Sequence, residues 1–441
     1  MKPLLLGLAT PLALVVVQQQ LLLRLPPHLE RLEPSQASQG PAALTLQFSR
    51  PMNHNSVAAA SRLQPPQPGR WLGDGNRLSL NLEPGSTITG PLTLLLGGRD
   101  QRGSALRPGQ WRWDPRPRVL AVVPTNGGEQ LQLLQSNGRW QPLSPVWAQI
   151  VALEPLGDGS AVALVSRNAQ KRLQIWRIPL QQRNLAPLKR GLAPVRADRP
   201  HLLDQGDLVF AHLSSNRRGE LLIQQGGMDP GSAITVLWPK GQRPKRLPLE
   251  ASGPMRLLPQ GGAVVVPASD GLLLHDLPPR PPRQQTLPGR RDLSSFCPRT
   301  GRALLVRHWP DFRRSLELVE PGQAPRQLWI GSQAVVASSC SGGGERVWLA
   351  LVEGVQRPQL TVLALDRRGR LLARRPLVGW ELEPGTPLSH DPSRNQLLLV
   401  LRPWGQGGAL APPAQVMLLD GTSLAITPLG KQARLALWLP P

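Results

Sequence analysis

The sequence holds few side chains in arrangements that support catalysis. It has no G-x-S-x-G segment that would hold a nucleophilic serine, and no glycine-rich phosphate loop between a strand and a helix. Its seven histidines lack the i, i+4 spacing of a metal site and have no cysteine or carboxylate at metal spacing. We therefore expect no catalytic residues, no metal and no cofactor, and we favour a non-enzymatic function.

One enzymatic alternative stays open. Carboxylates from separate repeats can meet at the centre of a radial fold, where they would suit a glycan hydrolase or lyase acting at the channel mouth. With 28 acidic residues spread over 441, such a cluster is not expected. His212 and His308 lie on apolar runs and are predicted to be core or channel-lining residues.

Two tryptophans are candidates for ligand binding. Trp309 and Trp404 lie in Trp-Pro-Asp and Pro-Trp-Gly loops, where a ring would be exposed on one face. Packing between blades explains four others, which lie at or next to strand positions among alternating apolar residues: Trp176, Trp238, Trp329 and Trp348. The same explanation remains an alternative for the two candidates.

The two cysteines have equivalent places in adjacent repeats. Cys297 and Cys340 are 43 residues apart, and each stands just before a turn. Equivalent residues on neighbouring innermost strands approach each other in a radial fold, so a disulfide is possible if the Cα atoms come within about 7 Å. Two buried free thiols are the alternative.

The chain is strongly basic, with 51 Lys and Arg against 28 Asp and Glu and a net charge of +23. A biased codon supply explains this skew without a function. An anion-binding surface is the functional interpretation. Because the arginines are spread along the chain rather than gathered on one element, we do not expect nucleic-acid binding.

A turn followed by an alternating apolar run recurs six times between Gly157 and Asn395. The runs are AVALVS, LVFAHLSS, AVVVPAS, RALLVRH, RVWLALVE and QLLLVLR. A strand-based recurrence of roughly 40 to 55 residues is typical of a β-propeller, with four strands in each blade. We therefore predict an all-β chain with a propeller of about seven blades, six or eight being alternatives.

The propeller is predicted to close through its two ends. The segment Arg118–Leu143 supplies three strands of a blade, and the C-terminal RLALWLPP could supply the fourth. Such closure removes the exposed sheet edges that an open array would leave.

The N-terminus carries an apolar segment. Residues 4–23 are about long enough to cross a bilayer, although Gln18–Gln20 interrupt them. We predict an uncleaved signal anchor that places the chain on the periplasmic side of the inner membrane. A cleaved signal peptide and a cytosolic chain are the alternatives.

A first resemblance covers residues 36–113. The stretches LTLQFSRPM (Leu44–Met52) and GRDQRGSAL (Gly98–Leu106) resemble the opening and closing segments of the bacterial Ig-like domain of surface-layer and envelope proteins. Ser104 stands where that family usually has Asn. The resemblance implies a small β-sandwich that acts as a spacer or adhesive module and has no catalytic residues.

A second resemblance covers residues 116–441. The turns Cys297–Gly301 and Asp391–Ser393 are similar to the Ser-Pro-Asp-Gly turns of TolB-like and WD40-like propellers. Of the turns that precede the six recurring runs, only Asp158-Gly159 retains the Asp-Gly pair. The predicted domains are an anchor or signal (1–25), a linker (26–40), an Ig-like sandwich (41–115) and a propeller (116–441). The predicted function is binding of an envelope protein or an anionic polymer on a propeller face.

Overall fold

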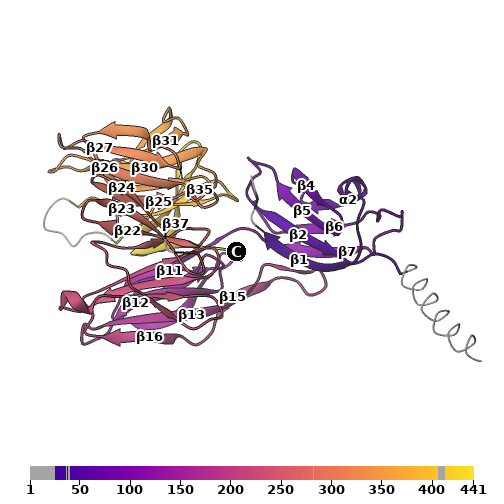
Figure 1. Ribbon diagram of the computed structural model, residues 1–441, viewed down its shortest axis with the longest axis horizontal. Coiled ribbons are helices and arrows are strands. Elements are labelled where there is room, and N and C mark those ends of the chain that lie inside the picture. The colour runs from indigo at the N-terminus through magenta and orange to yellow at the C-terminus, as the bar shows by residue number, and fades with distance from the viewer. Residues whose placement is uncertain (1–24, 36, 38–39, 282, 321, 406–412) are drawn as a thin grey trace, which may run out of the picture. The chain divides into compact units, whose positions relative to one another are not determined.

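The computed structural model describes residues 25–35, 37, 40–281, 283–320, 322–405 and 413–441. The predicted membrane segment, residues 4–23, lies outside these ranges. Within them, no helix is both long and apolar enough to cross a bilayer. The described chain forms two compact units, which Figure 1 shows as ribbons. Unit 1 comprises the residues up to Ser86, Gly90–Pro115 and Asn184–Leu192, and unit 2 comprises Thr87–Thr89, Arg116–Arg183 and Ala193–Pro441.

Unit 1 contains two four-stranded antiparallel sheets. The first has the order β1-β2-β5-β4 (Leu29–Ser35, Ala43–Phe48, Arg77–Leu82 and Gly69–Asp74), and the second has the order β14-β7-β6-β3 (Leu185–Pro187, Gly109–Trp113, Leu92–Leu96 and Arg62–Gln64). Alternate residues of β2 and β6 are buried, as the sequence pattern requires of half-buried strands. A short helix, α2 (His54–Ala60), begins at Asn53, whose side chain accepts a hydrogen bond from the Ser56 backbone N–H at 3.0 Å.

The structure corrects the predicted linker. Residues 26–40 contain β1, which pairs with β2 at the edge of the first sheet. The side chains of β1 are mostly exposed, so this strand lacks the apolar alternation that identifies the others. The strand β14 was also not expected in unit 1, because it belongs to a segment inside the predicted propeller.

Unit 2 contains seven antiparallel sheets, numbered here in chain order. Sheet 1 has the order β38-β8-β9-β10 (Leu435–Leu439, Arg118–Thr125, Gly128–Leu134 and Trp140–Trp147). Sheet 2 contains β11 (Gln149–Pro155), β12 (Ala161–Arg167), β13 (Leu173–Arg183), β15 (Ala193–Ala197) and β16 (His201–Gly206). Sheet 3 contains β17 (Phe210–Ser215), β18 (Leu221–Gly226), β19 (Ile234–Trp238) and β20 (Lys245–Leu247), with a 3-10 turn, η1 (Pro230–Ser232), between its middle strands.

The remaining sheets repeat this arrangement. Sheet 4 contains β21 (Arg256–Leu257), β22 (Ala263–Ala268), β23 (Gly271–Asp276) and β24 (Gln284–Pro288), and sheet 5 contains β25 (Arg291–Phe296), β26 (Ala303–His308), β27 (Arg314–Val319) and β28 (Arg326–Gly331). Sheet 6 contains β29 (Ala334–Cys340), β30 (Arg346–Glu353), β31 (Gln359–Asp366) and β32 (Leu371–Pro376). Sheet 7 contains β33 (Trp380–Leu382), β34 (Ser389–Asp391), β35 (Gln396–Pro403), β36 (Gln415–Asp420) and β37 (Ile426–Gln432).

The seven sheets form a closed ring. A separate apolar core fills the space between each sheet and the next, and a further core joins sheet 7 to sheet 1. The C-terminal strand β38 pairs with β8, as predicted, so the two ends of unit 2 share one sheet. An all-β chain with four-stranded sheets closed around an axis is a β-propeller, which confirms the predicted fold class.

The propeller has two rims. The turn rim consists of the turns that follow the innermost strands (156–160, 216–220, 258–262, 297–302, 341–345 and 392–395) and the third strands (135–139, 239–244, 366–370 and 420–425 among them). The loop rim, at the opposite ends of the strands, consists of the loops that follow the second strands (168–172, 227–233, 269–270, 309–313 and 354–358 among them) and the connections between sheets.

Candidate functional site

A cavity of about 530 Å³ lies on the axis of the propeller. The innermost strands of sheets 1 to 5 line it, together with the 384–387 segment that interrupts the innermost strand of sheet 7. Apolar side chains cover much of its wall. Its polar and charged members are Glu154, His212, Ser214, Ser215, Asn216, Arg217, Arg256, Ser294, Ser295 and Arg434. We call this space the axial cavity.

Glu154 is the only carboxylate among the described residues that line the axial cavity. Its Oε1 accepts a hydrogen bond from the Ser215 backbone N–H at 2.7 Å, and its Oε2 is 4.0 Å from Nη1 of Arg256. Burial raises the pKa of Glu154 to about 7, against the opposing effects of the Arg256 charge and the Ser215 N–H. The carboxyl group therefore titrates near neutral pH.

Arg256 and His212 face the same space. Nη1 of Arg256 donates to the Leu213 carbonyl at 3.1 Å, and the side chain is 48 % exposed. Burial, followed by the charge of Arg256, lowers the pKa of His212. His212 therefore contributes a neutral imidazole at pH 7, and Arg256 is the cation nearest to Glu154.

The guanidinium of Arg434 already has hydrogen-bond partners within the protein. It donates to both carboxylate oxygens of Glu129, with Nε and Nη2 at 2.7 and 3.0 Å, and Nη2 also donates to the Ile150 carbonyl. Oε2 of Glu129 in turn accepts from the Ile150 N–H at 2.6 Å. This group joins β38 to β9 and β11, so we assign it a structural role.

Hydrogen bonds between turns connect the innermost part of the turn rim. The Arg217 N–H donates to the Pro259 carbonyl at 2.9 Å, and the Arg299 N–H donates to the Gly342 carbonyl at 2.8 Å. Gln260 donates through Nε2 to the Arg299 carbonyl. The turns of sheets 3 to 6 are thereby joined one to the next.

The turn rim is rich in basic side chains. Those in its turns are Arg139, Arg217, Arg218, Lys240, Arg243, Arg280, Arg283, Arg299, Arg302, Arg367, Arg368, Arg370 and Arg394. Several of its carboxylates are already in ion pairs: Asp158 with Lys240 at 2.7 Å, Glu320 with Arg302 and Arg367 at 3.1 and 2.8 Å, and Asp366 with Arg370 at 2.6 Å. Among the described residues, no carboxylate lies within 4.0 Å of the exposed Arg243 and Arg368. The rim therefore carries an excess of positive charge.

Arg217 and Arg299 are close enough to affect each other. Burial and then the charge of Arg299 lower the pKa of Arg217, and burial lowers the pKa of Arg299 while Glu345 partly opposes that effect. Nη1 of Arg217 is buried and has no hydrogen-bond partner among the described residues. Like charges held together in this way favour a bound anion.

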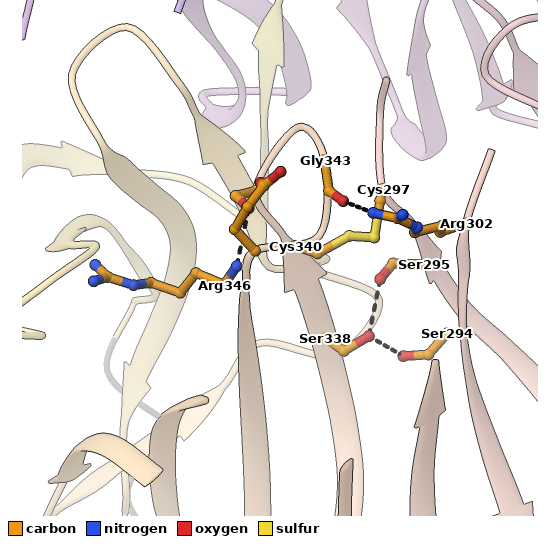
Figure 2. Close-up of a disulfide and its surroundings, with 10 residues drawn as sticks. Ser294, Ser295, Cys297, Arg302, Ser338, Cys340, Gly343 and Arg346 are labelled. Carbon is orange, nitrogen blue, oxygen red and sulfur yellow. Dashed lines mark hydrogen bonds between the residues drawn. A yellow bond between two sulfur atoms is a disulfide. The ribbon is translucent and has the colours of Figure 1, made fainter. Parts of the chain in front are cut away.

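The two cysteines form a disulfide, shown in Figure 2. Cys297 follows β25 and Cys340 ends β29, and their Cα atoms are 5.2 Å apart. Both residues are buried. Beside the bridge, the Ser338 hydroxyl lies 2.7 Å from that of Ser294 and 2.9 Å from that of Ser295, which also joins sheets 5 and 6 (Figure 2).

Trp309 lines a second cavity, of about 480 Å³, at the loop rim. Its Nε1 donates to the Ser315 hydroxyl at 2.9 Å, and the guanidinium carbon of Arg307 lies 3.8 Å from the ring centroid. Phe312 lines the same cavity and is 88 % exposed. The predicted aromatic candidate therefore lies on the propeller surface and is only partly buried.

Trp404 lies on the same rim but in sheet 7, whereas Trp309 lies in sheet 5. Its N–H donates to the Gly379 carbonyl at 2.8 Å, and the side chain is partly buried. It does not line the Trp309 cavity. The structure therefore does not bring the two predicted tryptophans into one site.

A metal site is not found where the structure describes the chain: no group of three or more His, Cys, Asp or Glu side chains there could hold an ion. The axial cavity also differs from a two-carboxylate glycosidase site, since its described lining contains one carboxylate. The cavity can bind an anion, and Glu154 can take up or release a proton near neutral pH.

Glu154, Arg256 and Arg217 were not predicted from the sequence as residues of a site. Glu154 and Arg256 interrupt the apolar runs VALEP and MRLLP on innermost strands. A charged residue within an innermost strand faces either an apolar core or the propeller axis. A charge at such a position could therefore have marked Glu154 and Arg256 as residues that face the axis. Their meeting across sheets 2 and 4 depends on the closure of the ring, which no local pattern contains.

No family model and no curated protein matches the sequence. Solved structures that are similar to the chain include TolB from Acinetobacter baumannii, at 13% identity and a TM-score of 0.43, covering 87% of this chain and 84% of that one. A putative 6-phosphogluconolactonase from Bacteroides fragilis gives 15% identity and a TM-score of 0.45, covering 74% and 98%. The β-propeller domain of the Trilobed protease from Pyrococcus furiosus gives 12% identity and a TM-score of 0.43, covering 79% and 94%. These similarities carry no functional conclusion, and the fold assignment follows from the strand pairing above.

Proposed function

We propose that the chain is a non-enzymatic binding module of the bacterial cell envelope whose turn rim binds an anionic polymer. The observation that carries this proposal is the excess of arginine and lysine around the turn rim, where several carboxylates are already paired. Because the charges lie in turns of several sheets, they suit an extended ligand better than a compact one. Release of counterions from such a ligand would make binding strongly salt-dependent.

A sulfated polysaccharide tests this proposal directly. We expect dextran sulfate to bind the full chain, with an affinity that falls steeply as salt rises, and neutral dextran not to bind. The double variant Arg243→Glu/Arg368→Glu should weaken binding by about tenfold or more, because it reverses two exposed charges of the turn rim.

A matched control uses the loop rim. Arg290 and Arg357 are also exposed arginines, but they lie at the opposite ends of the strands. The variant Arg290→Glu/Arg357→Glu changes the net charge by the same amount and should bind nearly as well as the wild type. Equal losses in both double variants would mean that net charge, rather than the turn rim, governs binding.

The envelope location is part of the proposal. It is supported by the apolar segment 4–23 in the sequence and by a disulfide, a bond that persists mainly in oxidising compartments. Protease added to spheroplasts should degrade the chain without membrane disruption. Protection of the chain until the membrane is broken would place it in the cytoplasm and contradict this part of the proposal.

A second candidate function is catalysis in the axial cavity. Glu154 favours it, because a carboxyl group with a pKa of about 7 is suited to general acid–base catalysis. A panel of envelope glycans tests this candidate. Turnover that is lost in Glu154→Gln with unchanged substrate binding would support an enzyme. No turnover with any member would leave the binding module as the better account.

A further inference from the structure

We propose that the axial cavity is a binding site for a small organic anion with an apolar body, and that Arg256 is the anchor for its anionic group. The site lies inside the ring. It shares Arg217 with the turn rim, but its anchor Arg256 lies on β21, outside the turns of that rim. Its volume of about 530 Å³ falls in the range of ligand pockets.

The charges in the cavity favour an anion. Arg256 donates a hydrogen bond through Nη1 to the Leu213 carbonyl, and the same atom lies 4.0 Å from Oε2 of Glu154. A guanidinium carries five N–H donors, and the Arg256 side chain lines the cavity and is 48 % exposed. Arg217 adds a second cation with a buried, unpartnered Nη1 among the described residues. A carboxylate or phosphate group matches the fork geometry of a guanidinium.

Apolar side chains form much of the remaining wall of the axial cavity, so we expect the same ligand to have an apolar body. Val151 lies on β11, lines the cavity and is 37 % exposed. Phe296, Leu293 and Leu437 line it from β25 and β38. Burying such surface against a ligand contributes about 25 cal/mol per Å², so a purely polar ion would leave this contribution unused.

Glu154 links binding to pH. Its ionised carboxylate competes with the ligand for Arg256 and repels it, so binding is stronger when Glu154 is protonated. The other charged or titratable groups around it are His212, which is neutral near pH 7, Arg217, and the Arg434–Glu129 pair. Glu383, beside the 384–387 segment, lies 3.8 Å from Arg402 and serves as its partner. With a Glu154 pKa of about 7, affinity should be constant below about pH 6 and fall by up to about tenfold per pH unit above pH 7.

Calorimetric titration of the full chain with 4-phenylbutanoate and its neutral amide tests the proposal. We expect the acid to bind at pH 6 at least about tenfold more tightly than the amide, and to bind more weakly at pH 8.5. Equal affinities for acid and amide, or an affinity for the acid that does not change with pH, would overturn it.

Three variants locate the site. Arg256→Gln should remove the preference for acid over amide, and Glu154→Gln should keep the pH 6 affinity at pH 8.5. Val151→Trp fills the cavity with Arg256 intact and should abolish binding of both compounds while the circular dichroism spectrum is retained. Unchanged binding in Val151→Trp or in Arg256→Gln would place the anion elsewhere. Because Arg243→Glu/Arg368→Glu should leave this binding unchanged, failure of this site and failure of the polymer proposal are distinguishable.

Discussion

The two rims of the propeller are built from the same strands and differ in what they expose. The turn rim is basic, its innermost turns in sheets 3 to 6 are hydrogen-bonded one to the next, and it contains the disulfide. The loop rim carries the four most exposed large apolar side chains among the described residues: Met228, Phe312, Val355 and Val378, each between 82% and 99% exposed. Hydrogen bonds and the disulfide join the turns of sheets 3 to 6, whereas the opposite rim presents these apolar side chains to solvent.

The largest expected loss of stability comes from replacing a tryptophan near the turn rim, and a tryptophan on the loop rim provides the comparison. Trp348 is fully buried between sheets 6 and 7, and its Nε1 donates to the Gly421 carbonyl of a turn-rim loop at 2.9 Å. Trp348→Ala should lower the free energy of unfolding by about 4 kcal/mol, because it leaves a large cavity. Trp309→Ala, on the loop rim, should cost about 1 kcal/mol, because that ring is already partly exposed. Urea unfolding of both variants makes the comparison, and equal losses would contradict it.

The disulfide should give the next largest effect. Replacing Cys297 and Cys340 together by Ser frees a 43-residue span of the unfolded chain and should cost about 2–4 kcal/mol. Wild-type protein unfolded without reductant should show no thiol that reacts with a labelling reagent, and two after reduction. Two reactive thiols without reductant would mean that the turn rim is not cross-linked between sheets 5 and 6.

Glu154 should make stability depend on pH from inside the ring. Its pKa is raised in the folded chain from 4.5 to about 7, so the folded state binds the proton more tightly and loses this advantage as pH rises from about 4.5 to 7. Glu154→Gln removes the cost of an ionised carboxylate in a 22 % exposed position. The free energy of unfolding of the variant, relative to that of the wild type, should therefore increase by about 2 kcal/mol between pH 5 and pH 8. A difference in unfolding free energy that is the same at both pH values would contradict the raised pKa.

The smallest effects compare single residues with positive φ on the two rims. Phe312 has φ +64° although it is a bulky residue, and Gly301 has φ +66°. Phe312→Gly should stabilise the chain by about 0.5–1 kcal/mol, since it relieves backbone strain and sacrifices little buried surface. Gly301→Ala should cost about 1 kcal/mol from φ alone, because a Cβ there meets nothing within 4 Å. Thermal unfolding should shift in opposite directions, and shifts of the same sign would contradict this account.

Local patterns predicted the propeller well and its site poorly. The runs AVALVS, RVWLALVE and QLLLVLR became the second strands β12, β30 and β35, because an apolar alternation bounded by turns leaves few other structures possible. The pairing of β38 with β8 followed from a blade that lacked its fourth strand. The edge strand β1 was missed, because most of its side chains are exposed and carry no pattern.

The axial cavity could not be predicted because it is a product of closure. Glu154, Arg256 and Arg217 come from three sheets, and their separation in sequence gives no sign that they share a space. Trp309 was identifiable from its loop, since an aromatic residue next to proline in a turn is typically exposed. Its separation from Trp404 depends on the order of sheets around the axis. Whether either ring binds a ligand stays a prediction.

Hydrogen exchange of the full chain with and without dextran sulfate shows which rim the polymer contacts. We expect slowed exchange in the turns 216–220, 239–244, 297–302 and 366–370, and unchanged exchange in the loops 309–313 and 354–358. Slowed exchange confined to those loops, with the turns unaffected, would contradict the assignment of binding to the turn rim.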